Sequence, residues 1–122
     1  MDTIRFEIGA KTDPADGLVD AVDIFVNVRN LVDIVREVEL PIRAREGKPD
    51  SAGRYAGLPP GEIFLPSPRL LGEPTTYFDY DSSEGKVAVL GCECGEVGCW
   101  PFRVKIALRD DVVIWSDFEQ PH

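Results

Sequence analysis

The sequence predicts an α+β fold: a mainly antiparallel sheet of about five strands, one helix, and a long irregular segment rich in proline. Three observations support this prediction. Apolar residues alternate with polar ones near both ends of the chain, as in half-buried strands. Over residues 31–38 the apolar spacing becomes helical, and residues 42–77 concentrate proline and glycine. We expect one domain over residues 1–122, because a chain of this length buries enough surface to fold alone.

The chain is expected to open with two antiparallel strands. Residues 3–8 alternate apolar and polar side chains, and residues 22–28 repeat the pattern. Residues 11–17 between them hold an Asp-Pro and an Asp-Gly pair. Both pairs favour turns, because proline fixes φ and glycine permits unusual φ. A long connection therefore joins the two predicted strands.

A single helix is expected next. Apolar side chains recur at helical spacing over residues 31–38. Asn30 can accept a backbone hydrogen bond as the N-cap, and Asp33 lies in the first turn, where the helix dipole favours negative charge. We expect Pro41 to end this helix, because proline has no N–H to donate.

The segment of residues 42–77 is expected to be irregular, because repeated prolines cannot donate to a sheet ladder. Its apolar side chains should nevertheless pack against the sheet; these are Tyr55, Ile63, Phe64, Leu65, Leu70 and Leu71. Three further strands are predicted at residues 86–90, 102–108 and 112–118. The sequence Arg-Asp-Asp at 109–111 predicts a hairpin turn between the last two strands.

The most specific motif is the cysteine turn, residues 91–101, with the sequence Gly-Cys-Glu-Cys-Gly-Glu-Val-Gly-Cys-Trp-Pro. It holds all three cysteines of the chain. In a hairpin centred near residue 110, the numbers of opposed residues sum to about 220. His122 would then lie within a residue or two of Cys99. Cys92, Cys94, Cys99 and His122 can therefore converge, and three thiolates with one imidazole form a ligand set that structural zinc sites use.

Three interpretations of the cysteine turn stay open. The favoured one is a packed corner, since reduced cysteine is often buried, the three glycines can adopt unusual backbone angles, and Trp100 can cover the turn. The second is zinc binding, although CxC followed by one more cysteine departs from the usual paired CxxC spacing. The third is a reactive thiol at Cys94. Glu93 and Glu96 argue against it, because nearby carboxylates raise the pKa of a thiol.

Composition restricts the class of partner. Twenty-two acidic residues against thirteen basic ones give a net charge of −9, which would repel a nucleic-acid backbone. No apolar run approaches the roughly 20 residues of a membrane span, and the start lacks a signal-peptide pattern. We therefore expect a cytoplasmic protein with neither nucleic acid nor membrane as partner. The acidic residues Asp79, Asp81 and Glu84 are expected to form a solvated turn, because their spacing differs from that of a calcium loop.

Three functional hypotheses follow. We favour a non-enzymatic binding or interaction module with a protein partner, whose cysteine turn is structural, with or without zinc. This choice rests on the incompleteness of every catalytic motif: the only histidine is His122, and there is no glycine-rich phosphate loop. The first alternative is a small metal- or thiol-dependent enzyme that uses Cys92, Cys94 and Cys99. The second is an acidic partner or inhibitor of a basic protein.

Residues 90–101, together with the closing Val-Ile-Trp-Ser-Asp-Phe-Glu-Gln-Pro-His of residues 113–122, resemble an uncharacterised family of small bacterial proteins. Members of that family share a CxCGxxGCWP turn and a closing FxQPH segment. The resemblance covers the last third of the chain firmly and the opening strands and helix loosely. It implies no assigned activity and no catalytic residues, and it implies that related chains continue beyond the QPH segment.

Overall fold

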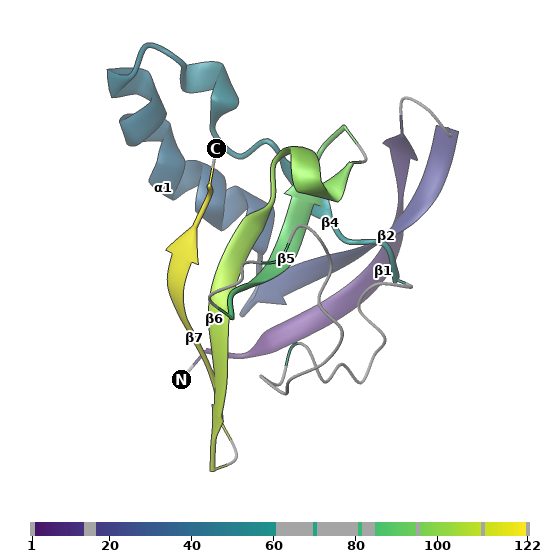
Figure 1. Ribbon diagram of the computed structural model, residues 1–122. Helices are drawn as coiled ribbons and strands as arrows, with labels where there is room; N and C mark the ends of the chain where they lie inside the picture. The colour runs from purple at the N-terminus through teal and green to yellow at the C-terminus, as the bar shows by residue number, and fades with distance from the viewer. Residues whose placement is uncertain are drawn as a thin grey trace.

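The computed structural model describes residues 2–13, 17–60, 70, 81, 85–94, 96–110 and 112–121, with backbone alone at residues 10–13 and 17–19. In this part of the chain, one α-helix accompanies two antiparallel sheets, of three and four strands (Figure 1). This confirms the predicted α+β class, with the strands divided between two sheets. The elements are β1 (Ile4–Asp13), β2 (Gly17–Val26), β3 (Arg29–Asn30), α1 (Leu31–Arg45), β4 (Tyr55–Gly57), β5 (Val87–Cys92), β6 (Phe102–Arg109) and β7 (Val112–Glu119), with 3₁₀ helices η1 (Pro49–Ser51) and η3 (Val97–Cys99).

The first sheet has the strand order β1-β2-β3, and its opening hairpin confirms the predicted antiparallel pair. Pairing runs without interruption from Ile4 opposite Val26 to Asp13 opposite Gly17, so both strands are longer than the sequence pattern indicated. The second strand ends at Val26 and not at residue 28. Asn27 has a φ of 58°, a left-handed conformation that interrupts an extended strand.

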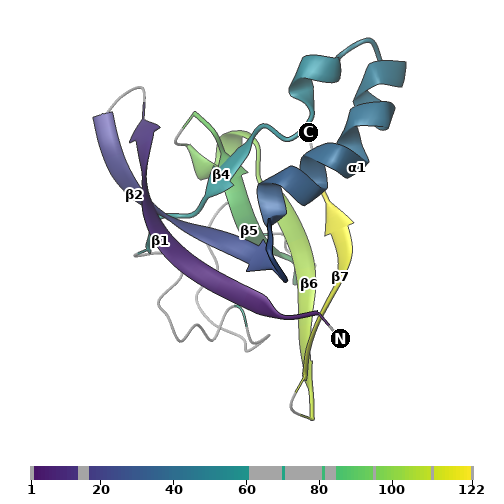
Figure 2. The same ribbon diagram turned by 180° about the vertical axis from the view of Figure 1, so that it is seen from behind.

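Helix α1 begins as predicted and packs one face into the core. The side-chain oxygen of Asn30 accepts a hydrogen bond from the backbone N–H of Val32 at 2.9 Å, which satisfies one of the first free donors of the helix. Leu31 and Val35, one turn apart, are buried. The helix lies at one end of the sheets, and its second half extends beyond them together with η1 (Figure 2).

The prediction that Pro41 ends the helix is wrong, because α1 continues through Pro41 to Arg45. Proline removes one helical donor, and the surrounding turns keep theirs. The stop signal lies further on, at Gly47, whose φ is 74°. The N–H of Lys48 reaches back to the carbonyl of Arg43 at 2.8 Å, the closing bond of a glycine-terminated helix end.

The two sheets meet at a close backbone crossing between β2 and the end of β4. The N–H of Val22 donates to the carbonyl of Leu58 at 2.8 Å, an isolated bridge outside the named ladders. A Cβ atom added at Gly57 would overlap the carbonyl oxygen of Val22, so glycine at this position allows the approach. The segment predicted to be irregular thus contributes a short strand, β4, which pairs antiparallel with β5.

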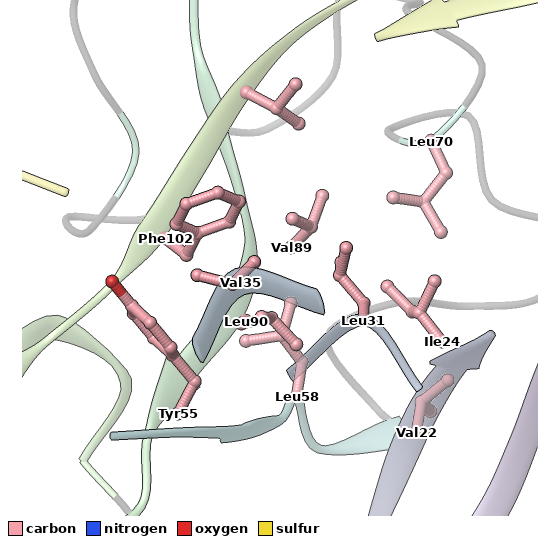
Figure 3. Close-up of a cluster of buried hydrophobic side chains, with 11 residues drawn as sticks. Val22, Ile24, Leu31, Val35, Tyr55, Leu58, Leu70, Val89, Leu90 and Phe102 are labelled. Carbon is pink, nitrogen blue, oxygen red and sulfur yellow. The ribbon is translucent and has the colours of Figure 1, made fainter. Parts of the chain in front are cut away.

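A cluster of buried apolar side chains lies where the sheets and α1 meet (Figure 3). In it, Leu31 and Val35 of α1 lie beside Leu58 and Leu90. The cluster consists of Val22, Ile24, Leu31, Val35, Tyr55, Leu58, Leu70, Val89, Leu90, Phe102 and Val104. Burial of Tyr55 and Leu70 confirms that the proline-rich segment packs on the core at these positions. Its other predicted core residues, at 63–65 and 71, lie outside the described residues.

Of the three acidic residues expected to form a solvated turn, Asp81 is described and contributes to the sheet. A carboxylate oxygen of Asp81, which is half-buried, accepts a hydrogen bond from the N–H of Ala88 at 2.9 Å. Asp81 is therefore more than a solvated charge, because it satisfies a donor of β5. Asp79 and Glu84 lie outside the described residues.

The predicted hairpin of residues 109–111 is confirmed. Arg109 lies opposite Val112, and the regular register continues to Lys105 opposite Ser116. A bulge follows at Asp117, which has a φ of 55°. The last pair of the ladder is Arg103 opposite Glu119.

Candidate metal centre

Strand β5 delivers the first cysteine of the turn. All six of its residues are buried, and Cys92 is the last of them. Across the β4–β5 pair, Cys92 lies opposite Tyr55. Pairing with the β4 side continues one residue beyond Cys92, because the N–H of Glu93 donates to the carbonyl of Arg54 at 3.4 Å. The start of the cysteine turn is thus anchored to β4.

The 3₁₀ helix η3 brings the third cysteine back towards the first. Its last residue is Cys99, whose N–H donates to the carbonyl of Glu96 at 3.1 Å. A Cβ atom added at Gly91 would lie 3.0 Å from both Cα and Cγ2 of Val97. Gly91 therefore lets η3 lie against β5 by leaving space. Its φ is outside the left-handed region, so the expectation of an unusual backbone angle is wrong at this glycine, whereas Gly95 lies outside the described residues.

The sulfur atoms of Cys92, Cys94 and Cys99 all lie within 4.8 Å of one another, an arrangement compatible with a bound metal ion. Thiolates at the usual Zn–S length of about 2.3 Å are roughly 3.8 Å apart in a tetrahedral site. A contraction of at most about 1 Å would therefore bring the three sulfurs to zinc geometry. The donor set fits a thiophilic metal, since soft thiolates select zinc over hard cations.

Burial differs between the three thiols. Cys92 is buried, whereas Cys94 and Cys99 are exposed, and all three are free of disulfides. A packed corner formed by small buried cysteines was the favoured interpretation of the sequence. Exposure of two of the three does not support it, because their sulfurs gain little from apolar packing.

The local environment moves the pKa values of two thiols in opposite directions. Burial raises the pKa of the Cys92 thiol to about 11. The pKa of Cys94 is lowered, first because the backbone N–H of Glu96 hydrogen-bonds to its sulfur. The charge of Glu96 does raise the pKa of Cys94, as predicted, but the amide hydrogen bond, together with hydrogen bonds from Cys92 and Cys99, outweighs it.

A cation borders the thiols. The Nε of Arg54 donates to a carboxylate oxygen of Glu93 at 2.9 Å, and this hydrogen bond is the main reason why the pKa of Arg54 is raised. Negative charge on Cys92 and Cys99 raises the same pKa further, which places the guanidinium within electrostatic reach of both sulfurs. Arg54 can thus offset part of the negative charge of a thiolate cluster.

No sequence pattern indicated that Arg54 and Tyr55 lie beside the cysteine turn. Both belong to the segment expected to be irregular, and β4 is three residues long. A strand this short shows no periodicity, and no residue spacing places Arg54 beside the cysteines.

The predicted fourth ligand, His122, lies outside the described residues, so its role stays a prediction. The ladder from which its position was extrapolated ends at Arg103 opposite Glu119, and Cys99 lies in η3, before β6 begins. The chain nevertheless continues alongside the turn, since the side-chain amide of Gln120 donates to the carbonyl of Pro101 at 3.3 Å. The end of β7 thus approaches the last residue of the cysteine motif.

Comparisons with known proteins add no relative. No protein-family model, curated protein or solved structure matches the chain. The resemblance to small bacterial proteins with a CxCGxxGCWP turn therefore stays a prediction. Among the described residues, no helix combines the length and the apolar character needed to cross a membrane.

Proposed function

We propose that this chain is a non-enzymatic cytoplasmic binding module whose cysteine turn is a structural zinc centre. The ligands in this proposal are Cys92, Cys94 and Cys99, with His122 as the fourth. The convergence of three free thiol sulfurs within 4.8 Å carries the proposal. A zinc ion held there would fasten η3 to the end of β5, and metal binding of this kind contributes directly to folding stability.

The electrostatics of the turn support zinc. Three thiolates around a divalent ion leave a net negative charge, and the guanidinium of Arg54 is placed to offset it. Cys94, whose pKa is lowered, loses its proton more readily than Cys92, whose pKa is raised. Cys92 must be deprotonated by the metal itself, as ligating thiols commonly are.

Apolar side chains exposed on α1 and on the β6–β7 hairpin support a binding role. Helix α1 exposes Val38, Leu40 and Ile42, and the β6–β7 pair exposes Leu108, Ile114 and Phe118. Exposed apolar side chains of this size are common at sites of protein–protein contact when they gather into a patch. The net charge of −9 favours a partner with a basic surface.

The zinc centre is tested by elemental analysis of the untagged protein, with thiols counted in denaturant before and after chelation. We expect about one zinc per chain and a lower melting temperature after chelation. Cys94→Ser and Cys99→Ser should lose zinc, whereas the control Glu93→Gln, which keeps every thiol, should retain it. Protein without zinc and with three titratable thiols from the start would rule out the zinc centre.

A second candidate function is a thiol-dependent enzyme that uses Cys94. Its exposure and its lowered pKa favour this alternative, because a thiolate is the reactive form. Alkylation by iodoacetamide near neutral pH should then modify Cys94 well before Cys92. If Cys94 reacts no faster than an unstructured cysteine peptide, this candidate is excluded.

A further inference from the structure

Helix α1 has an intrinsic weak point at Pro41, one turn before its C-terminal end. Pro41 has no N–H, so the helical bond that this residue would donate to the carbonyl of Glu37 is missing. The last turn, residues 42–45, therefore depends on contacts with the rest of the molecule more than an unbroken helix would. Its C-terminal closing bonds hold the end of the helix together locally but do not attach it to the sheets.

A cation–π contact joins this last turn to the cysteine turn. The guanidinium carbon of Arg43 lies 5.3 Å from the ring centroid of Trp100. The Arg43 side chain is only 16% exposed and also pairs with Glu46 at 3.3 Å. Trp100 directly follows Cys99, so the ring moves with that ligand.

A pair of hydrogen bonds attaches the turn of α1 just before Pro41. The carboxylate of Glu39 accepts from the hydroxyl of Tyr55 at 2.6 Å and from the N–H of Gly53 at 2.9 Å. Tyr55 is the residue that faces Cys92 across the β4–β5 pair. Burial and the hydrogen bond to Glu39 raise the pKa of Tyr55, and the positive charge of Arg43 lowers it in part. Arg43, which lies over the ring of Trp100, is thus also close enough to act electrostatically on Tyr55.

We infer that metal binding at the cysteine turn orders the second half of α1 through Trp100 and Tyr55. This inference rests on the proposed function, because it requires an ion at Cys92, Cys94 and Cys99. Zinc would draw the sulfurs from separations of up to 4.8 Å towards about 3.8 Å and hold Cys99 in place. The ring of Trp100 is then fixed under Arg43.

The consequence concerns exposed apolar side chains of the helix, of which Val38 and Ile42 lie one turn apart. Val38, Leu40 and Ile42 are 64%, 47% and 49% exposed, on either side of Pro41. Their mutual arrangement depends on whether the two halves of α1 form one straight element. Metal loading therefore controls how Val38 and Ile42, exposed on either side of Pro41, lie relative to each other in the proposed binding role.

The test is hydrogen exchange of the full chain, comparing protein saturated with zinc to protein held metal-free by a chelator. We expect amides of residues 42–46 to exchange about five- to tenfold more slowly with zinc, and amides of residues 31–36 to change little. Zinc bound at one equivalent with unchanged exchange at residues 42–46 would overturn the inference and leave the zinc centre intact. Failure to bind zinc would instead overturn the proposed function.

Two variants test the route of coupling. Arg43→Met should abolish the zinc-dependent protection and, by thermodynamic reciprocity, weaken zinc binding by the same five- to tenfold factor. Arg45→Met is the matched control, because the Arg45 guanidinium donates to the Pro41 carbonyl within the helix, and it should change neither quantity. Full protection in a folded Arg43→Met protein would exclude the route through Trp100. If that variant does not fold, Arg43→Gln takes its place. The comparison of wild-type exchange with and without zinc still tests whether metal binding orders the helix end.

Discussion

Replacing Gly91 by alanine is expected to push η3 away from β5 and to weaken zinc binding. The added Cβ would lie 3.0 Å from Cα and Cγ2 of Val97, whereas carbon atoms in favourable contact are about 3.5–4.0 Å apart. Rotation of the valine side chain cannot relieve the contact with Cα. The start of η3 must therefore move by about 0.5 Å or more, and Cys99, at its other end, moves with it.

The expected magnitudes follow from this displacement. Overpacking of this kind costs about 1–3 kcal/mol of stability, and the lower backbone entropy of alanine in the unfolded chain offsets roughly 0.4–1 kcal/mol of that. A net loss of about 1–2 kcal/mol is expected for the metal-free protein. Changes that disturb the residues supporting a metal ligand typically weaken metal binding by about 10–100-fold, and we expect a loss of zinc affinity in this range for the Gly91→Ala variant.

Urea denaturation of the metal-free protein measures the first quantity, and competition with a chromophoric zinc chelator measures the second. Gly85→Ala is a suitable control, because Gly85 has a φ of 89° and open space around its Cβ position. It should cost a similar 1–2 kcal/mol or so through backbone strain and leave zinc affinity unchanged. Wild-type zinc affinity in Gly91→Ala would refute the argument that the contact of η3 with β5 sets the geometry of the site.

Three further outcomes are expected. Gly57→Ala should destabilise the protein by about 3 kcal/mol or more in urea denaturation, because the new Cβ meets a backbone oxygen, that of Val22; a smaller loss would show that the sheets can separate locally. The ion pair of Glu119 with Lys86 lowers the pKa of the Glu119 carboxyl. This pair should stabilise the folded protein by less than about 1 kcal/mol above roughly pH 4.3, and the contribution is lost as the pH falls through the pKa of Glu119 in the folded protein. Glu119→Gln should remove that part of the acid dependence of the melting temperature, and an unchanged profile would contradict it. Because the pKa of Cys92 is about 11, zinc must displace its proton, and zinc affinity should rise at least about tenfold per pH unit between roughly pH 6 and 8; a flat profile would exclude Cys92 as a ligand.

Regular local patterns predicted most of the fold. The alternation in β1 and β6, the apolar run of β7 and the N-cap at Asn30 are short-range signals, and the structure realises each of them. The wrong predictions, at Pro41 and in the segment that contains β4, arose where contacts between distant parts of the chain outweighed the local pattern. Pro41 is tolerated because one missing donor is a small loss in a helix whose neighbouring turns are complete. Strand β4 exists because β5 offers it a partner, which no feature of residues 55–57 announces.

Part of the candidate site was also predictable, because its cysteines lie close together in the sequence. The spacing of Cys92, Cys94 and Cys99 within one turn made their convergence a local matter, and the structure brings the three sulfurs together. Their different burial depends on how η3 lies on β5, and the pKa of Cys94 depends on where a single amide points. These are tertiary details that a count of nearby carboxylates does not capture.

The crossing of Val22 and Leu58 also bears on the order in which the protein folds. The β1–β2 and β6–β7 hairpins join neighbouring stretches of chain and can form early, whereas this crossing joins distant ones and carries a larger loop-closure cost. We expect the crossing to be absent from the folding transition state. A substitution that weakens it should then leave the folding rate nearly unchanged and accelerate unfolding, so the lifetime of the native protein depends on this junction more than its rate of formation does.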